Sequence, residues 1–270
     1  MERIFLLYHP GHSGGSWFHA CCRVHPQKIT ILEEAHLAQQ LDFEYETMDD
    51  FDDKVIAYLE WRLYCGDACV GTMKSFGHKA AAWGKERGAV VAQIYRNPIK
   101  ILARNLPRGH KLPWIRRNVG KPTTNQEVFE GHVIYYARMF EAFLKRAEQG
   151  AIMIRLEKLT ASVRTDGRHF IQIMEAITQL PWTDRQVEII RAHRPPGVAY
   201  NTHVEQYPDG SYGRPYHVPY VLEPDRLDWE PDQSAKLAWR SWKPWQRRLW
   251  LEHMSEIMPA LGYDNWEIKG

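Results

Sequence analysis

Short apolar runs alternate with longer amphipathic stretches over the first 160 residues. Five runs have the length and composition of buried strands, at residues 4–8, 28–32, 69–74, 89–95 and 151–156. Helices are predicted between them, beginning near Ser16, Phe51, His78, Pro98 and Thr124. This alternation predicts an α/β fold, a parallel β-sheet flanked by helices, whose ligands bind at the carboxyl ends of the strands.

The pattern is different in the last third of the chain. Residues 183–194 are expected to form a helix that ends at Pro195-Pro196-Gly197, and residues 200–231 are rich in Tyr, Pro and Gly. We expect residues 195–231 to form a long loop, either a lid or acceptor-side insertion or a surface excursion, within a single domain spanning 1–270. A final helix over residues 241–261, with Pro244 in its first turn, would present a stripe of large apolar residues as core or as a dimer contact: Trp242, Trp245, Leu249 and Trp250.

Composition narrows the class of protein. The formal net charge of +2 over 270 residues gives no general case for nucleic-acid binding. We expect no signal peptide and no membrane span. The four cysteines lack both a disulfide framework and a zinc-binding spacing, so reduced thiols in a cytoplasmic protein are predicted.

The segment IFLLYHPGHSGGSW, residues 4–17, joins an apolar strand to a helix through a glycine-rich turn. Such a turn presents backbone N–H groups at a helix N-terminus, where the helix dipole also favours an anion. Gly11, Gly14 and Gly15 would let the backbone approach a phosphate closely, while Ser13 and Ser16 would add hydroxyl donors. An alignment with G-x-x-x-x-G-K-[ST] places Gly15 at the lysine and His9 at the first glycine, which disfavours an ordinary ATP or GTP hydrolase.

The same residues resemble the 5′-phosphosulfate loop of sulfotransferases that use 3′-phosphoadenosine-5′-phosphosulfate (PAPS). That loop is approximately P-[KR]-S-G-[TS]-[TS]-[WL], and SGGSW at residues 13–17 is similar to its core. His12 stands where the family usually has Lys or Arg. The resemblance implies a P-loop NTPase-like sulfotransferase architecture.

A second segment, AVVAQIYRNPIKILAR at residues 89–104, resembles the 3′-phosphate motif of that family. Arg96, Asn97 and Pro98 match, and Arg104 stands where the family commonly has a serine. Arginine can also grip a phosphate through paired hydrogen bonds. Three weaker similarities follow in the family's order: VGTMKSFGH with Lys74 matching and Phe76 replacing a histidine, AIMIRLEKL with Arg155, Glu157 and Leu159 matching, and LGYDN at residues 261–265.

The resemblance implies sulfuryl transfer from PAPS to a hydroxyl or amine by in-line displacement, without a metal. It implies these donor-binding residues: His12, Ser13, Gly14, Gly15, Ser16, Trp17, Arg96 and Arg104. His12 would protonate the leaving phosphate or else only hydrogen-bond the loop. The candidates for the general base are Glu34, Glu33 and His78, although adjacent glutamates also suit a solvated helix start and His78 a first helical turn.

The sequence does not identify the acceptor substrate or the assembly. The acceptor would be a small molecule or a glycan, no nucleic acid is expected, and a homodimer is a candidate assembly. A basic run at residues 104–121 borders either the nucleotide or an anionic acceptor, or is a solvated loop. The alternatives to a sulfotransferase are a P-loop kinase of small molecules and a nucleotide-binding protein of the same fold that has lost catalysis.

Overall fold

The structure is a computed structural model that describes residues 2–10, 13–33, 47–73, 77–106, 124–192, 198–203, 216–221 and 231–263. The chain forms two compact units, Met1–Ile94 with Ile152–Leu227, and Tyr95–Ala151 with Asp228–Gly270. A single domain over residues 1–270 stays a prediction.

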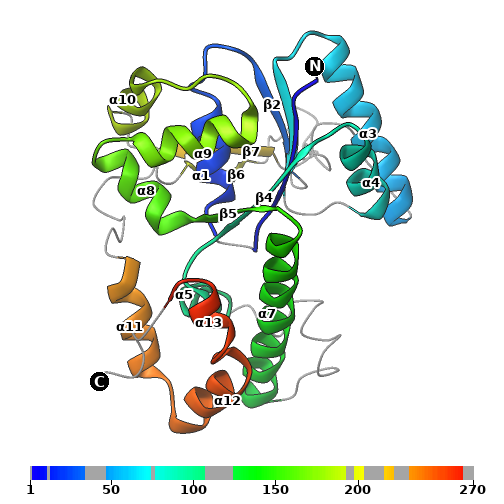
Figure 1. Cartoon of the computed structure of the whole chain (residues 1–270). Coiled ribbons are helices and arrows are strands. Elements are labelled where there is room, and N and C mark those ends of the chain that lie inside the picture. The colour runs from blue at the N-terminus through cyan, green and yellow to red at the C-terminus, as the bar shows by residue number, and fades with distance from the viewer. Residues whose placement is uncertain are drawn as a thin grey trace, which may run out of the picture. The chain divides into compact units, whose positions relative to one another are not determined.

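A five-stranded sheet forms the centre of the first unit (Figure 1). Its strands in chain order are β1 (Ile4–Tyr8), β2 (Ile29–Glu33), β3 (Cys69–Met73), β4 (Val90–Tyr95) and β5 (Ile152–Arg155). Their order across the sheet is β2-β3-β1-β4-β5, and β1 pairs in parallel with both β3 and β4. All five predicted strands are confirmed to within one residue at each end.

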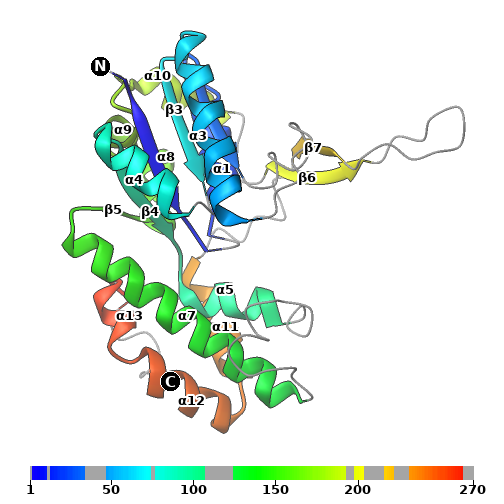
Figure 2. The same cartoon turned by 90° about the vertical axis from the view of Figure 1, so that its right-hand side faces the viewer.

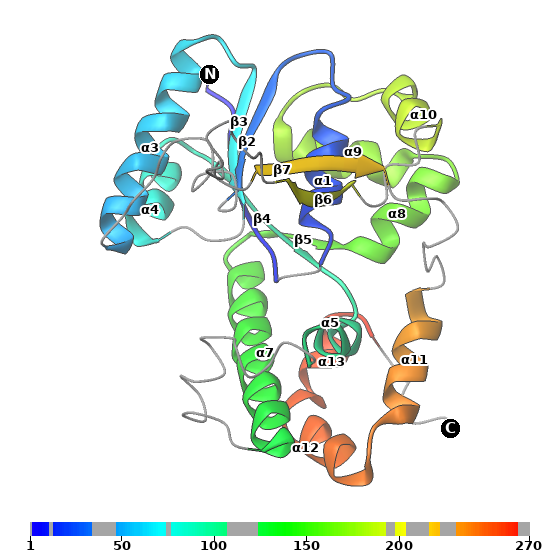
Figure 3. The same cartoon turned by 180° about the vertical axis from the view of Figure 1, so that it is seen from behind.

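Helices cover both faces of this sheet (Figures 1 and 3). One face carries α3 (Met48–Tyr64) and α4 (His78–Glu86), and the other carries α1 (Gly15–Cys22), α8 (Leu156–Arg164), α9 (Arg168–Thr178) and α10 (Asp184–Ala192). Because successive side chains of a strand point to opposite faces, β1 contributes to two cores. Phe5 and Leu7 lie in the core with Phe18 and Phe170, whereas Ile4 belongs to the core on the α3 and α4 face.

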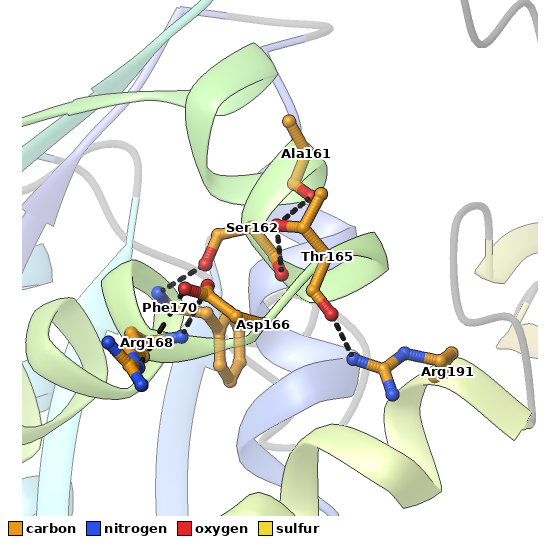
Figure 4. Close-up of polar contacts among 7 residues, drawn as sticks. All are labelled: Ala161, Ser162, Thr165, Asp166, Arg168, Phe170 and Arg191. Carbon is orange, nitrogen blue, oxygen red and sulfur yellow. Dashed lines mark hydrogen bonds and ion pairs between the residues drawn. The ribbon is translucent and has the colours of Figure 1, made fainter.

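Polar contacts fix the turn between α8 and α9 (Figure 4). The Ser162 hydroxyl oxygen accepts the Phe170 N–H at 3.0 Å. From α10, the Arg191 guanidinium donates to the carbonyl oxygens of Val163 at 2.9 Å and Thr165 at 3.0 Å. Since the last carbonyls of a helix have no partner inside it, Arg191 caps the C-terminal end of α8.

The long loop expected over residues 195–231 contains two strands. β6 (Val198–His203) and β7 (Tyr216–Val221) pair in antiparallel, with Ala199 opposite Tyr220 and His203 opposite Tyr216. The prediction of an irregular loop is therefore wrong for these segments, and β6 contacts α1. That residues 195–231 form a lid or acceptor-side insertion stays a prediction.

The second unit is helical in its described part (Figure 2). Its helices are α5 (Pro98–Asn105), α7 (Asn125–Glu148), α11 (Pro231–Ser241), α12 (Pro244–Met254) and α13 (Ile257–Ala260). The predicted helix over residues 124–148 is confirmed, and a capping box starts it: Thr124 accepts the Glu127 N–H while the Glu127 carboxylate accepts the Thr124 N–H.

The single C-terminal helix predicted over residues 241–261 is wrong, because Ser241 ends α11 and the remaining residues are divided between α12 and α13. Pro244 does occupy the first turn of α12, where its missing N–H leaves no bond unmade. Trp242 and Trp250 are buried with their rings 5.4 Å apart, so this part of the apolar stripe belongs to the core.

The four cysteines are free thiols, of which Cys21, Cys22 and Cys69 are buried and Cys65 is exposed. Burial raises the pKa of the Cys21 and Cys22 thiols well above the ordinary value and that of Cys69 to about 12. These three thiols are therefore protonated and unreactive at neutral pH. Across the described ranges, no helix is both long and apolar enough to cross a membrane.

Candidate nucleotide-binding site

The glycine-rich turn follows the central strand of the sheet. Because β3 and β4 lie on opposite sides of β1, the carboxyl end of β1 is a topological switch point, the usual position of a ligand crevice in such sheets. The Ser13 N–H and hydroxyl both donate to the Pro10 carbonyl, at 3.2 and 2.6 Å. Ser13 is fully buried, and its two donors close the turn from inside.

Gly14 has a backbone conformation that only glycine adopts without strain. Its φ of 98° and ψ of 15° lie in the left-handed region, and it forms the N-cap of α1 without a side-chain cap. A Cβ at this position would meet both Cδ atoms of Leu156 at 2.6 Å. Leu156 is the first residue of α8, so α8 braces the turn from behind.

Gly15 is required for a different reason, since it is the first residue of α1 and its φ is not positive. A Cβ on Gly15 would lie 2.5 Å from Nε2 of His9 and 2.7 Å from its Cε1. The His9 ring is oriented by its Nδ1, which lies 3.0 Å from the Pro10 carbonyl oxygen. A carbonyl can only accept, so Nδ1 carries a proton and donates to it.

The first turn of α1 is suited to an anion. The first hydrogen bond inside the helix runs from the Phe18 N–H to the Gly14 carbonyl at 2.9 Å. The amides of Gly15, Ser16 and Trp17 precede it, so helix geometry gives them no partner within α1. This turn contains no acidic residue, and the positive end of the helix dipole adds to the amides.

Trp17 is buried and packs against α9 in the core that both helices share. Its ring contacts Phe170 edge-on, with the ring centroids 6.0 Å apart. The indole therefore helps to hold the first turn of α1 against α9. His12 and the Ser16 side chain lie outside the described residues.

The Arg-Asn-Pro segment starts α5 in the second unit. Arg96 directly follows β4, and Asn97 is the N-cap whose side-chain oxygen accepts the Ile99 N–H at 3.0 Å. Pro98 occupies the first helical position, which explains the Asn-Pro pair as a helix start. Arg96 is half-buried. Arg104 is exposed in the last turn of α5, about 9 Å of helix beyond Pro98.

Two of the three candidate general bases, His78 and Glu33, lie on different elements, α4 and β2. His78 is exposed at the first position of α4, and the Gly77 and Ala80 N–H groups at that helix end donate to the buried Asp52 carboxylate at 2.6 and 3.0 Å. Asp52 thus already occupies the anion-binding end of α4. Glu33 ends β2, opposite Met73 of β3, and its side chain lies outside the described residues.

Glu34, Lys74 and Phe76 lie outside the described residues, as does most of the basic run at residues 104–121. The segment AIMIRLEKL, the second of the three weaker similarities, is described: Arg155 ends β5, its Nε lies 3.7 Å from Oε2 of the buried Glu157, and Leu159 is fully buried. Among the residues that the structure describes, no three His, Cys, Asp or Glu side chains are grouped as metal ligands.

A search of the solved structures gives the comparison that decides the fold. The crystal structure of mouse sulfotransferase SULT7A1 complexed with PAP is similar to this chain with a TM-score of 0.51 and 15% sequence identity, over 97% of this chain and 87% of that one. The chain has the sulfotransferase fold. No protein-family model matches the chain, and a search of curated proteins finds no match.

The sulfotransferase fold confirms the predicted parallel α/β class and its P-loop-like architecture. Within this fold the structure shows two contacts of the loop that the sequence pattern does not predict. Leu156 lies against Gly14, and His9 lies against Gly15. Neither contact has a signal in the local sequence, because the turn pattern gives no hint of what packs against a glycine.

Proposed function

We propose that the protein transfers a sulfuryl group from PAPS to a hydroxyl or amine of a small molecule or glycan. The observation that carries the proposal is the anion-suited first turn of α1 at the switch point of a sulfotransferase fold. The solved structure of that fold contains PAP, which we take to be the desulfated product, 3′-phosphoadenosine-5′-phosphate.

The loop is the proposed holder of the 5′ end of the donor. The amides of Gly15, Ser16 and Trp17 would donate to the 5′-phosphosulfate. The Ser16 hydroxyl is proposed as a further donor from the sequence pattern alone. Gly14 shapes the turn through its left-handed backbone, and Ser13 shapes it through its hydrogen bonds to the Pro10 carbonyl. The absence of a first-turn carboxylate in α1 fits an anionic group at this end of the helix.

The 3′-phosphate is assigned to the Arg96 segment. Arg96 follows β4, the strand that pairs with β1 through Phe5–Val90 and Tyr8–Gln93, so both motifs follow neighbouring parallel strands. A guanidinium can bind a phosphate through two parallel hydrogen bonds. Arg104, at the far end of α5, is proposed as a second and weaker contact.

The chemistry is a displacement at sulfur. The acceptor oxygen or nitrogen bonds to sulfur while the bond from sulfur to the 5′-phosphate oxygen breaks, and the electron pair leaves with the desulfated nucleotide. His12 is proposed to give a proton to that leaving oxygen. Glu34, Glu33 or His78 is proposed to take the acceptor's proton. The exposed position of His78 agrees with access to an acceptor.

A direct transfer assay tests this proposal. Purified protein is incubated with PAPS carrying radiolabelled sulfate and a panel of phenols, alcohols, amines and glycans. We expect label to move to at least one acceptor class and Arg96→Ala to weaken binding of the product nucleotide. Tight binding of that nucleotide without transfer to any acceptor would favour a protein that only binds. Transfer of phosphate from ATP in place of sulfate would support a kinase.

A further inference from the structure

We propose that His9 is a positioning residue for the 5′ end of the donor, acting from the space that a side chain at position 15 would fill. The inference rests on the proposed function, because it concerns how the same loop is held. It begins with the contact between the His9 ring and Gly15. Atoms Nε2, Cε1 and Cδ2 of His9 lie 2.5, 2.7 and 2.9 Å from the point that a Cβ on Gly15 would occupy.

Position 15 carries a side chain in both loop patterns with which this segment can be aligned. The nucleotide-hydrolase pattern has lysine there, and the sulfotransferase pattern has threonine or serine. Here the position is glycine, and the volume is filled by an imidazole from the end of β1. Real Cβ atoms essentially never lie closer than 3.0 Å to such neighbours, so residue 15 can be larger than glycine only if the His9 ring moves.

The His9 ring is also tied to the backbone of the turn. The Pro10 carbonyl oxygen lies 3.0 Å from His9 Nδ1, 3.2 Å from the Ser13 N–H nitrogen and 2.6 Å from the Ser13 hydroxyl oxygen. The Pro10 carbonyl therefore accepts hydrogen bonds from His9, before the turn, and from Ser13, after it. The imidazole links this carbonyl to the first residue of α1, whose amide begins the proposed anion site.

These two contacts give His9 a role that depends on the ligand. Without the ring, the turn loses one hydrogen bond and the packing against Gly15, so the amides that follow are less well ordered before a ligand arrives. Ordering them on binding then reduces the affinity for an anion at the 5′ position. A group elsewhere on the nucleotide is unaffected.

Two ligands separate this role from general stability. 3′-Phosphoadenosine-5′-phosphate has a phosphate at the 5′ position, and adenosine 3′-phosphate lacks it. By calorimetry, His9→Ala should lower the affinity for the first by up to about tenfold, the size of one neutral hydrogen bond such as that from His9 Nδ1 to Pro10, and leave the second within about twofold. His9→Phe keeps the ring volume without the Nδ1 donor. Its affinity for 3′-phosphoadenosine-5′-phosphate should lie between those of the unaltered protein and His9→Ala.

The variant His25→Ala is the matched control. His25 is buried in the same unit, near the other end of α1, where its ring nitrogens lie 3.2 Å from the Gln27 carbonyl and 3.0 Å from the Pro181 carbonyl. Its loss should reduce thermal stability and leave the ratio of the two affinities unchanged. If His9→Ala behaves as His25→Ala does, His9 is structural only and the inference is wrong.

A double variant tests the shared space itself. Gly15→Ala should weaken binding of the 5′-phosphorylated ligand because the new methyl displaces the His9 ring. In His9→Ala/Gly15→Ala the methyl has room, so the combined loss should be smaller than the product of the single losses. Multiplicative losses would overturn the inference. If the unaltered protein binds neither nucleotide, the proposed function fails first, and this result is distinguishable from a failure confined to His9.

Discussion

Replacing Gly14 with alanine should destabilise the first unit more than an ordinary glycine substitution does. Two separate effects add at this position. The φ of 98° places a non-glycine residue in the left-handed region, which costs about 1–2 kcal/mol. The new Cβ would also meet both Cδ atoms of Leu156 at 2.6 Å, and forcing a methyl into a packed site costs about 1–3 kcal/mol. We therefore expect the free energy of unfolding to fall by about 2–5 kcal/mol.

Equilibrium unfolding in urea, followed by circular dichroism, measures this loss, and Gly66→Ala is its matched control. Gly66 lies in the same unit with a φ of 85°, but a Cβ there would meet nothing within 4 Å. Its substitution should show the backbone effect alone, about 1–2 kcal/mol. The difference between the two variants is then the contact with Leu156.

A cycle with Leu156→Ala isolates that contact. In Gly14→Ala/Leu156→Ala the steric part disappears and the backbone part remains, so the double variant should be more stable than the sum of the single losses predicts, by about 1–3 kcal/mol. Additive losses would refute the idea that α8 braces the turn. A Gly14→Ala variant no less stable than Gly66→Ala would refute it as well.

Three further predictions concern stability away from the loop. Asp52→Asn should lower the free energy of unfolding by about 2–3 kcal/mol, because the buried carboxylate accepts two backbone N–H groups at the start of α4. Burial lowers the pKa of His132 from 6.5 to about 4. Stability measured by urea unfolding should therefore be full above pH 6.5 and fall by about 3 kcal/mol toward pH 4, and His132→Leu should remove this loss. Arg191→Met should cost about 1 kcal/mol in thermal unfolding, since it uncaps α8.

Each of these predictions has a matched control. Asp53→Asn breaks only an exposed ion pair with Lys79 and should change stability by less than about 0.5 kcal/mol. His169→Leu, at an exposed histidine, should leave the pH profile unchanged. Arg168→Met, at a side chain 84% exposed, should be nearly neutral. A variant as mild as its control would contradict the role assigned to the buried or capping partner.

Much of the sheet could be predicted from the sequence because its strands are buried on both faces. Phe5 and Leu7 serve one core and Ile4 the other, so β1 is a continuous apolar run with turn residues after it. The end of β5 was less clear. Leu156 extends the apolar run, yet it begins α8 with no turn residue in between.

The helices α8, α9 and α11 are missing from the sequence prediction because their helix start and stop signals are weaker. In α9, Phe170, Met174 and Ile177 follow helical spacing, and this pattern could have identified the helix. The strands β6 and β7 were hidden by their prolines and tyrosines, which resemble loop composition. The division between α12 and α13 falls at Ser255–Glu256, where neither residue is a helix breaker.

The glycine-rich loop could be predicted from its glycines, but the side chains that pack against these glycines could not. The pattern SGGSW indicates a close backbone approach, but it does not say that Leu156 or the His9 ring is the neighbour that excludes a Cβ. Such contacts depend on how the fold brings distant segments together. The assignment of Ser13 also changes in this light, because its hydroxyl donates to Pro10 inside the turn.

The most direct test of the central claim is a calorimetric titration with two isomeric nucleotides. 3′-Phosphoadenosine-5′-phosphate and ADP contain the same atoms and differ only in whether the second phosphate is on the 3′ oxygen or on the 5′-phosphate. The proposed function predicts binding of the first at least about tenfold tighter than ADP, with or without magnesium, because Arg96 would grip the 3′-phosphate. Equal affinities, or preference for ADP with magnesium, would contradict it.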